Sequence, residues 1–136
     1  MVEYVTFPTM PILRAHRVID GNRRWSLVQN LYHNGDVVTS GFITDGASVP
    51  RLLWPLFPPY GKLFPAAIIH DWNYYKQVIT RKQADSQFKS NMKHCGMSWI
   101  TRTIIYRSVR LFGGIAWHRN TLRHKATFWE NGRVKI

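Results

Sequence analysis

Hydrophobic and polar residues alternate imperfectly through the first third of the chain, and turn sequences divide that third into three strand-like runs. The runs cover residues 12–19, 25–33 and 36–44, separated by Asp-Gly-Asn at 20–22 and Asn-Gly at 34–35. Asn-Gly between two such runs favours a tight hairpin, because both central residues of a type I′ turn need positive φ. The pattern therefore predicts a three-stranded antiparallel meander.

Prolines dominate the segment that follows. Residues 50–65 contain five of the seven prolines of the chain, together with large apolar residues such as Trp54 and Phe57. Such a density of prolines excludes a long helix or a central strand. We therefore expect a packed irregular segment that crosses from the strands to the helices, without a domain boundary.

Helical spacing begins after the prolines. Residues 66–78 show the stripe pattern of a helix, and Pro65 suits its first turn. Thr80 and Gln83 form a capping-box pattern, which predicts the start of a second helix that ends near Gly96.

A third helix is predicted after the second. Ser98 can cap a helix over residues 99–112, and Gly113-Gly114 is expected to end it. In the tail, Asn-Gly at residues 131–132 favours a short hairpin between Phe128-Trp129 and residues 134–136.

These elements together predict an α+β protein. The N-terminal meander precedes the proline-rich segment and a C-terminal group of about three helices. We expect one domain over residues 1–136, mainly β over 1–49, irregular over 50–65, helical over 66–116, with a basic tail over 117–136.

Composition supports a packed domain. The 136 residues are 45% hydrophobic and 14% aromatic, which argues against disorder. Cys95 is the one cysteine, so an intrachain disulfide framework and a cysteine-based zinc site are excluded. We expect no signal peptide at the N-terminus. We also expect no transmembrane segment, because three arginines interrupt the longest apolar tract, residues 99–117.

Positive charge is concentrated in the second half of the chain. The formal net charge is +12, and residues 76–125 carry eleven basic residues against one acid, Asp85. This stretch is either a solvated face or a surface that docks on an anionic partner, and its interleaved aromatic residues favour docking. The candidate partner-binding residues are Lys89, Lys93, Arg102, Arg107, Arg110, Arg119 and Arg123.

Acidic residues are scarce, so each one in the middle of the chain needs an explanation. Between Asp36 and Glu130 there are only Asp45, Asp71 and Asp85. The short connection between the first two helices should fold one back on the other, so that a carboxylate can reach the ring of His70.

A carboxylate beside an imidazole supports two kinds of chemistry. A histidine held by a carboxylate is a general base for water, and several carboxylates can hold a hard cation. Structural alternatives remain open: Asp45 can cap a turn, Asp71 can pair with an arginine, Asp85 can pair with Lys89, and His70 can be a hydrogen-bonded core histidine.

Three ordered motifs resemble a known family. Residues 41–51 (GFITDGASVPR), 70–74 (HDWNY) and 81–88 (RKQADSQF) resemble the small phage and prophage family known as domain of unknown function 1353. The resemblance covers roughly residues 41–96. It implies a phage origin and a place in the virion or the host cytoplasm, but no settled activity.

A looser resemblance concerns the chemistry. His70-Asp71-x-x-Tyr74 followed by Ala84-Asp85-x-x-Phe88 is similar to the catalytic helices of phospholipases A2, especially the viral capsid type. The resemblance implies that His70 is the general base, Asp85 orients it, and Asp71 binds a divalent cation, calcium rather than zinc. Residues 44–48 take the place of the glycine-rich calcium loop in chain order but do not match its spacing.

We therefore expect a phage-encoded accessory protein with a His70–Asp85 hydrolytic site for ester or phospholipid bonds. Asp71 and Asp45 are the candidate metal ligands, and Tyr74, Ser48 and Arg51 are supporting residues. The alternative is a non-enzymatic virion protein of the tail or neck, docked on other phage structural proteins. A third hypothesis, a binder of nucleic acid, rests on charge alone. Acidic lipid is another candidate partner, and the sequence also allows an oligomer.

Overall fold

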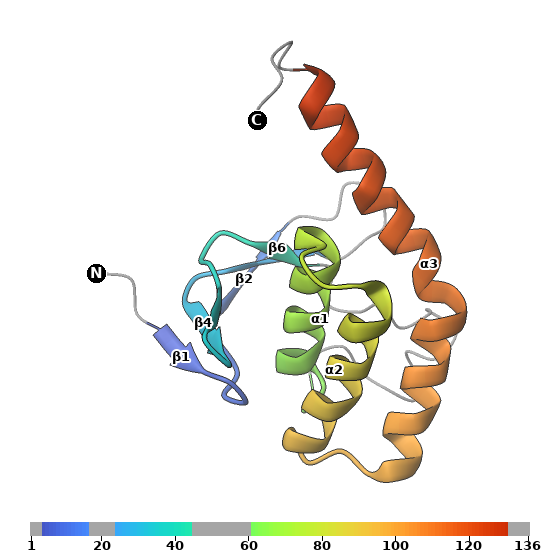
Figure 1. The fold of residues 1–136 in the computed structure, drawn as a ribbon. Helices are drawn as coiled ribbons and strands as arrows, with labels where there is room; N and C mark the ends of the chain where they lie inside the picture. Colours follow the sequence, from blue (N-terminus) through green and yellow to red (C-terminus); the bar gives the residue numbers. More distant parts are fainter. Residues whose placement is uncertain (1–3, 17–23, 45–60, 131–136) are drawn as a thin grey trace.

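The computed structural model describes residues 4–16, 24–44 and 61–130. Within these ranges six short strands precede three helices, which confirms the α+β class (Figure 1). The strands are β1 (Tyr4–Thr6), β2 (Leu13–His16), β3 (Arg24–Leu27), β4 (Asn30–His33), β5 (Asp36–Val38) and β6 (Ile43–Thr44). The helices are α1 (Phe64–Lys76), α2 (Arg81–His94) and α3 (Trp99–Glu130).

The strands form two small sheets rather than one meander. One sheet has the order β1-β4-β5 and the other β2-β3-β6, and β1 pairs with β4 in parallel. The single strand predicted over residues 25–33 is wrong, because the chain bends at Val28 and Gln29. Both residues bind Ile12: Val28 donates its N–H to the Ile12 carbonyl at 2.9 Å, and the Gln29 side chain accepts from the Ile12 N–H at 2.8 Å. These bonds hold the bend that takes the chain from β3 in one sheet to β4 in the other, between β1 and β5.

The turn predicted at Asn34-Gly35 is present. It joins β4 to β5 as an antiparallel pair in which His33 faces Asp36. Asn34 and Gly35 have φ values of 47° and 81°, the positive values that a type I′ turn requires. Local turn chemistry was therefore a reliable guide here.

The capping pattern before α2 is confirmed. The Thr80 hydroxyl accepts from the Gln83 N–H at 3.2 Å, and the Gln83 side chain accepts from the Thr80 N–H at 2.9 Å. Past the end of this helix, Gly96 takes a φ of 81°, which suits a glycine after a helix C-terminus. The first helix begins at Phe64, slightly before the predicted start, with Pro65 in its first turn as expected.

The predicted end of α3 at Gly113-Gly114 is wrong, since the helix continues to Glu130 (Figure 1). Gly113 is buried, and a Cβ built there would lie 2.6 Å from the hydroxyl of Tyr74. The glycine therefore allows α3 to approach α1 closely and does not terminate the helix. The strand expected at Phe128-Trp129 is likewise wrong because this backbone is helical, and residues 131–136 lie outside the described ranges.

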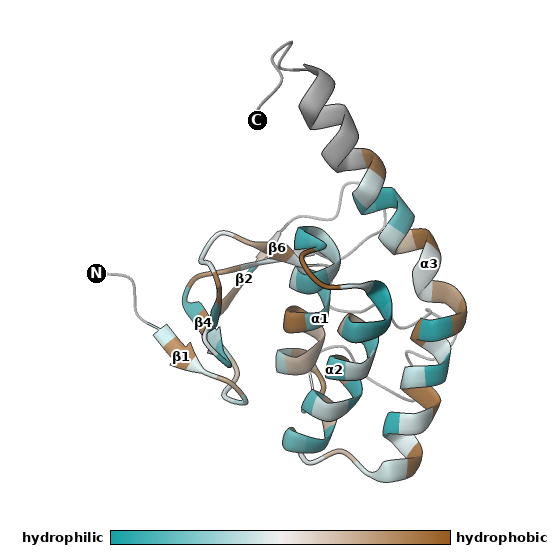
Figure 2. Cartoon of the chain, viewed as in Figure 1, coloured by the Kyte–Doolittle hydropathy of each residue, from teal (hydrophilic) through white to brown (hydrophobic). Residues whose placement is uncertain are grey.

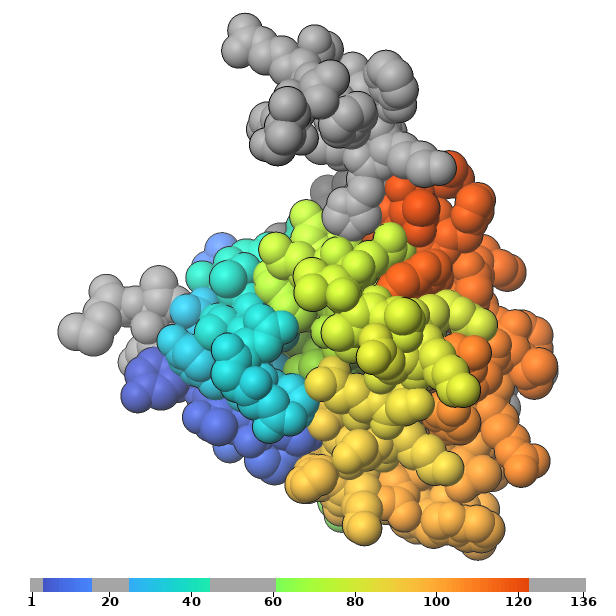
Figure 3. All heavy atoms as spheres, in the orientation of Figure 1, coloured from blue at the N-terminus to red at the C-terminus, as the bar shows by residue number. Residues whose placement is uncertain are grey.

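Helix α1 lies at the centre, between the strands and the other two helices (Figures 1 and 3). One hydrophobic cluster joins it to the strands and another joins it to α2 and α3. Every residue from Phe64 to His70 is buried, whereas α2 is mostly hydrophilic along its length (Figure 2). A helix covered on both sides has no need of a polar face. None of the helices in the described ranges has the length and apolarity that crossing a membrane would need.

Candidate functional site

His70 on α1 and Asp85 on α2 meet inside the helical part of the molecule. His70 Nε2 lies 2.7 Å from Asp85 Oδ1, and the two residues are 1% and 0% exposed. The short connection between α1 and α2 places the helices side by side, which brings together two residues 15 positions apart in the chain. The sequence-derived candidate base and its carboxylate therefore occupy one buried site.

Asp85 accepts hydrogen bonds from two further side chains. The Tyr74 hydroxyl donates to Oδ1 at 2.6 Å, and Arg110 Nη1 on α3 donates to Oδ2 at 2.7 Å. Arg81 Nη1 lies 3.7 Å from Oδ2. Burial raises the pKa of Asp85, but the hydrogen bonds from His70, Tyr74 and Arg110 outweigh it, and the pKa lies below its ordinary 3.8. Asp85 is therefore ionised at neutral pH.

Burial keeps the imidazole of His70 neutral, and the ionised carboxylate of Asp85 determines which ring nitrogen carries the proton. Burial lowers the pKa of His70 below its ordinary 6.5, although Asp85 opposes this shift, so the ring is neutral at neutral pH. An ionised carboxylate only accepts hydrogen bonds, so Nε2 carries the ring proton and Nδ1 keeps a lone pair. Nδ1 is buried and has no hydrogen-bond partner within the described part of the chain.

Aromatic side chains hold the His70 ring in place. Phe88 stacks on it with centroids 4.4 Å apart, and Tyr74 lies tilted against it at 4.3 Å. Burial is the largest cause that raises the pKa of Tyr74, and its hydrogen bond to Asp85 adds to it, so the phenol remains a donor. The rings of Tyr74 and Trp117 meet edge to face, with their centroids 5.1 Å apart. The ring of His70 is therefore fixed in orientation and closed to solvent.

Asp71 points to a different neighbour than His70 does. Its Oδ2 accepts a hydrogen bond from the Thr44 hydroxyl at 2.5 Å, which ties β6 to α1. Asp45, Ser48 and Arg51, predicted beside it, lie outside the described ranges. Calcium needs about six to eight oxygen ligands. Within residues 4–16, 24–44 and 61–130 no group of three or more such metal-binding side chains is found.

The predicted partner-binding residues fall into separate places. Lys89, Lys93 and Arg102 line a groove between α2 and α3. Arg107 and Arg119 are exposed on α3, whereas Arg110 turns inward to Asp85. Arg123 lies on the last part of α3, where side chains are not described.

The contacts of Arg81 and Arg110 with Asp85 were not predicted from the sequence, which placed Arg110 among the partner-binding residues. Arg81 precedes Asp85 by four positions, a spacing that places both on one face of a helix and could have revealed their contact. Arg81 also donates to the carbonyl of Val109 at 3.2 Å and so connects α2 to α3. Arg110 is 25 positions from Asp85, and no local pattern indicates that pairing.

One comparison with known proteins matches this chain. The family model described as protein of unknown function (DUF1353) matches residues 25–109, from β3 into α3. The matched span contains His70, Tyr74 and Asp85 but ends just before Arg110. No curated protein and no solved structure matches the chain.

Proposed function

The chain belongs to the DUF1353 family of proteins of unknown function, and we propose that it is a phage-encoded hydrolase whose general base is Nδ1 of His70. The observation that carries this proposal is the lone pair of Nδ1, buried without a partner in the described chain while Asp85 holds the other ring nitrogen. A buried acceptor without a partner costs about 1–3 kcal/mol. A water molecule that donates to Nδ1 would remove this cost and would stand where a general base needs it.

The proposed reaction is the hydrolysis of an ester. Nδ1 of His70 takes a proton from water while the water oxygen attacks the carbonyl carbon. The imidazolium that forms is stabilised by the Asp85 carboxylate, 2.7 Å from Nε2. The ring then gives the proton to the departing alkoxide, so the products are a carboxylic acid and an alcohol. Tyr74 and Arg110 hold Asp85 in its charged form throughout.

Phospholipids are the proposed substrate class. The motifs His70-Asp71-x-x-Tyr74 and Ala84-Asp85-x-x-Phe88 resemble the catalytic helices of phospholipases A2, and here His70 and Tyr74 share the Asp85 carboxylate. A net charge of +12 favours approach to anionic lipid. Because His70 is closed to solvent, we propose that a movement of the protein opens a path to Nδ1 at the lipid surface.

The test is cleavage of labelled phospholipid in vesicles, with and without added calcium. We expect His70→Gln to abolish cleavage, and we expect the same change at His118, an exposed histidine on α3, to preserve it. Thermal unfolding of each variant shows whether it remains folded. Full cleavage by folded His70→Gln, or no cleavage of phospholipid or simple esters by the unaltered protein, would contradict the proposal.

A structural virion protein of the tail or neck is the second candidate. It is supported by the sealed position of Asp85, which joins α1, α2 and α3 through His70, Tyr74 and Arg110. In this case the hydrogen bonds around Asp85 serve only to hold the three helices in position relative to one another. Mass spectrometry of purified particles distinguishes the two: a fixed copy number supports the structural role, and absence from particles contradicts it.

A further inference from the structure

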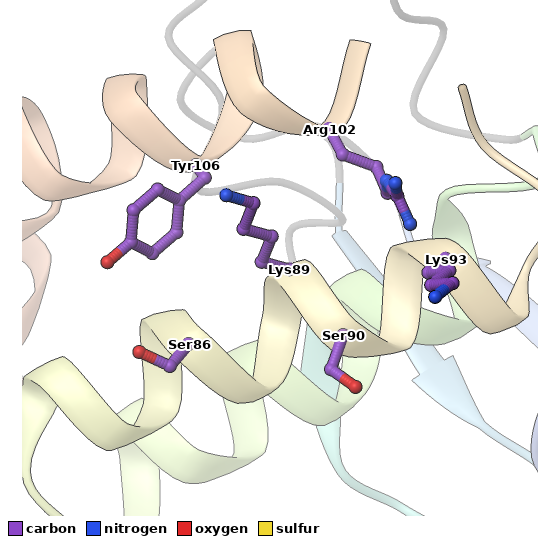
Figure 4. A pocket seen from close by; sticks show the side chains of 6 residues that line it. All are labelled: Ser86, Lys89, Ser90, Lys93, Arg102 and Tyr106. Atoms are coloured by element: carbon purple, nitrogen blue, oxygen red, sulfur yellow. The ribbon is translucent and has the colours of Figure 1, made fainter. Parts of the chain in front are cut away.

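A groove between α2 and α3 gathers donors of hydrogen bonds and positive charge. It has a volume of about 420 Å³, within the range of about 300–1,000 Å³ typical of small-molecule pockets. Two turns of α2 and one turn of α3 supply its walls (Figure 4). The lining residues are Ser86, Lys89, Ser90, Lys93, Arg102 and Tyr106.

The lining is suited to an anion with several oxygens. Three of its side chains are cations and the other three carry hydroxyl groups, and no acid is among them. Asp85, the one acid of α2, already accepts from His70, Tyr74 and Arg110 inside the molecule. Guanidinium, ammonium and hydroxyl donors together recognise phosphate. The positive charge of the groove is therefore not neutralised by an acidic side chain among its lining residues.

The placement of its charged side chains favours binding of an anion in the groove. Lys89 Nζ lies 5.0 Å from the centre of the Tyr106 ring, which holds the ammonium at one end. At the other end Arg102 extends from α3 toward Lys93 on α2 (Figure 4). Nε of Arg102 is buried and has no hydrogen-bond partner in the described ranges. An anion bound here would accept a hydrogen bond from Nε of Arg102. It would also reduce the repulsion between the positive charges of Arg102 and Lys93.

We propose that this groove is a binding site for a phosphate group, carried by a lipid headgroup or by a small soluble phosphomonoester. The cations surround one short groove and do not follow a long row, which suits a single phosphate better than a nucleic-acid backbone. The volume leaves room for an organic part beside the phosphate, against the ring of Tyr106. This assignment does not depend on hydrolysis at His70.

Binding is tested with three probes at constant ionic strength. Inorganic phosphate and glycerol 3-phosphate are titrated by calorimetry, and vesicles of phosphatidylcholine with or without phosphatidic acid are tested by sedimentation. Binding of the soluble probes identifies a soluble ligand, whereas binding of phosphatidic acid vesicles alone identifies the lipid headgroup. No binding of any phosphate probe overturns the proposal.

The variants Lys93→Gln and Arg102→Gln separate the groove from general positive charge. We expect each to weaken binding about tenfold, the loss of one charge-assisted hydrogen bond. Arg107→Gln removes the same charge from an exposed position of α3 outside the groove and should change affinity less than about twofold. Equal losses in all three variants would show diffuse attraction, including attraction to nucleic acid, and would overturn the proposal. Thermal unfolding confirms that each variant is folded.

Discussion

The two ring nitrogens of His70 have different surroundings, and this difference decides what the residue can do. Nε2 faces an ionised carboxylate at 2.7 Å, whereas Nδ1 has no partner within the described chain. The rings of Phe88 and Tyr74 pack against the imidazole, and exchange of its two nitrogens by rotation would break the hydrogen bond to Asp85. The fold thus selects the neutral tautomer that has its basic lone pair on Nδ1.

The lowered pKa of His70 predicts how stability depends on pH. The unfolded chain takes up a proton at His70 near pH 6.5, whereas the folded protein takes it up only at lower pH. The contribution of this residue is therefore complete above pH 6.5, and the free energy of unfolding decreases as the pH falls from 6.5 to the folded pKa. Urea unfolding of the unaltered protein and of His70→Gln, measured at several pH values, isolates this contribution.

Subtracting the two curves removes the effect of His33, whose pKa is also lowered by burial. The difference between the proteins should shrink as the pH falls below 6.5. A difference that stays constant or grows toward acid pH would show that the folded ring accepts a proton readily. In that case Nδ1 of His70 would not be a buried acceptor that lacks a partner in the described chain.

At the scale of elements, local chemistry was predictable and long-range packing was not. The capping box at Thr80 and the turn at Asn34 depend on a few neighbouring residues, and both are present. The juxtaposition of His70 and Asp85 was foreseen because a short connection folds two helices together. The break at Gln29 depends on a contact with Ile12, 17 positions away, which strand periodicity does not contain.

The two glycines of α3 show the same limit. A glycine pair is a common helix end, so Gly113-Gly114 predicted one. Here the absence of a side chain serves contact between helices: a Cβ on Gly113 would lie 2.6 Å from the Tyr74 hydroxyl. This role of Gly113 depends on how α3 packs on α1, which the local sequence does not show. The pairing of Arg110 with Asp85 depends on the same packing and was missed for the same reason.

Alanine at each glycine of this pair provides a matched test. Both positions are within a helix, where alanine in place of glycine adds about 1 kcal/mol of stability. At Gly114 the nearest atom to an added Cβ is 4.0 Å away, so this gain should be observed.

At Gly113 the Cβ must displace a phenol that is bound to Asp85, and overpacking costs about 1–3 kcal/mol. We therefore expect Gly114→Ala to stabilise the protein and Gly113→Ala to destabilise it in urea unfolding. Equal gains would show that α3 does not approach Tyr74 this closely.

At the scale of the whole molecule, an excess of positive charge surrounds a buried negative one. The net charge is +12, yet Asp85 at the junction of the three helices is ionised and 0% exposed. Arginines on α2 and α3 meet there, which joins the helices by charge as well as by apolar packing. Removing a positive charge can therefore have opposite effects, depending on whether that charge faces Asp85 or solvent.

Glutamine at Arg110 and at Arg107 tests this distinction. The two arginines are three positions apart on α3, and each change removes one positive charge. Arg110→Gln loses a charged hydrogen bond of 2.7 Å to a buried carboxylate and should lower the free energy of unfolding by about 2 kcal/mol. Arg107 is exposed, so Arg107→Gln should change it by less than about 0.5 kcal/mol, toward greater stability as repulsion decreases.

Salt provides an independent measurement of the same two effects. Added salt screens repulsion among exposed cations, so it should stabilise the unaltered protein and Arg107→Gln alike, the latter slightly less. The contact between Arg110 and Asp85 is partly buried and is screened much less, so salt should not restore the stability lost in Arg110→Gln. If high salt made Arg110→Gln as stable as the unaltered protein, the loss would have come from surface charge. The three helices would then be held together without the ion pair at Asp85.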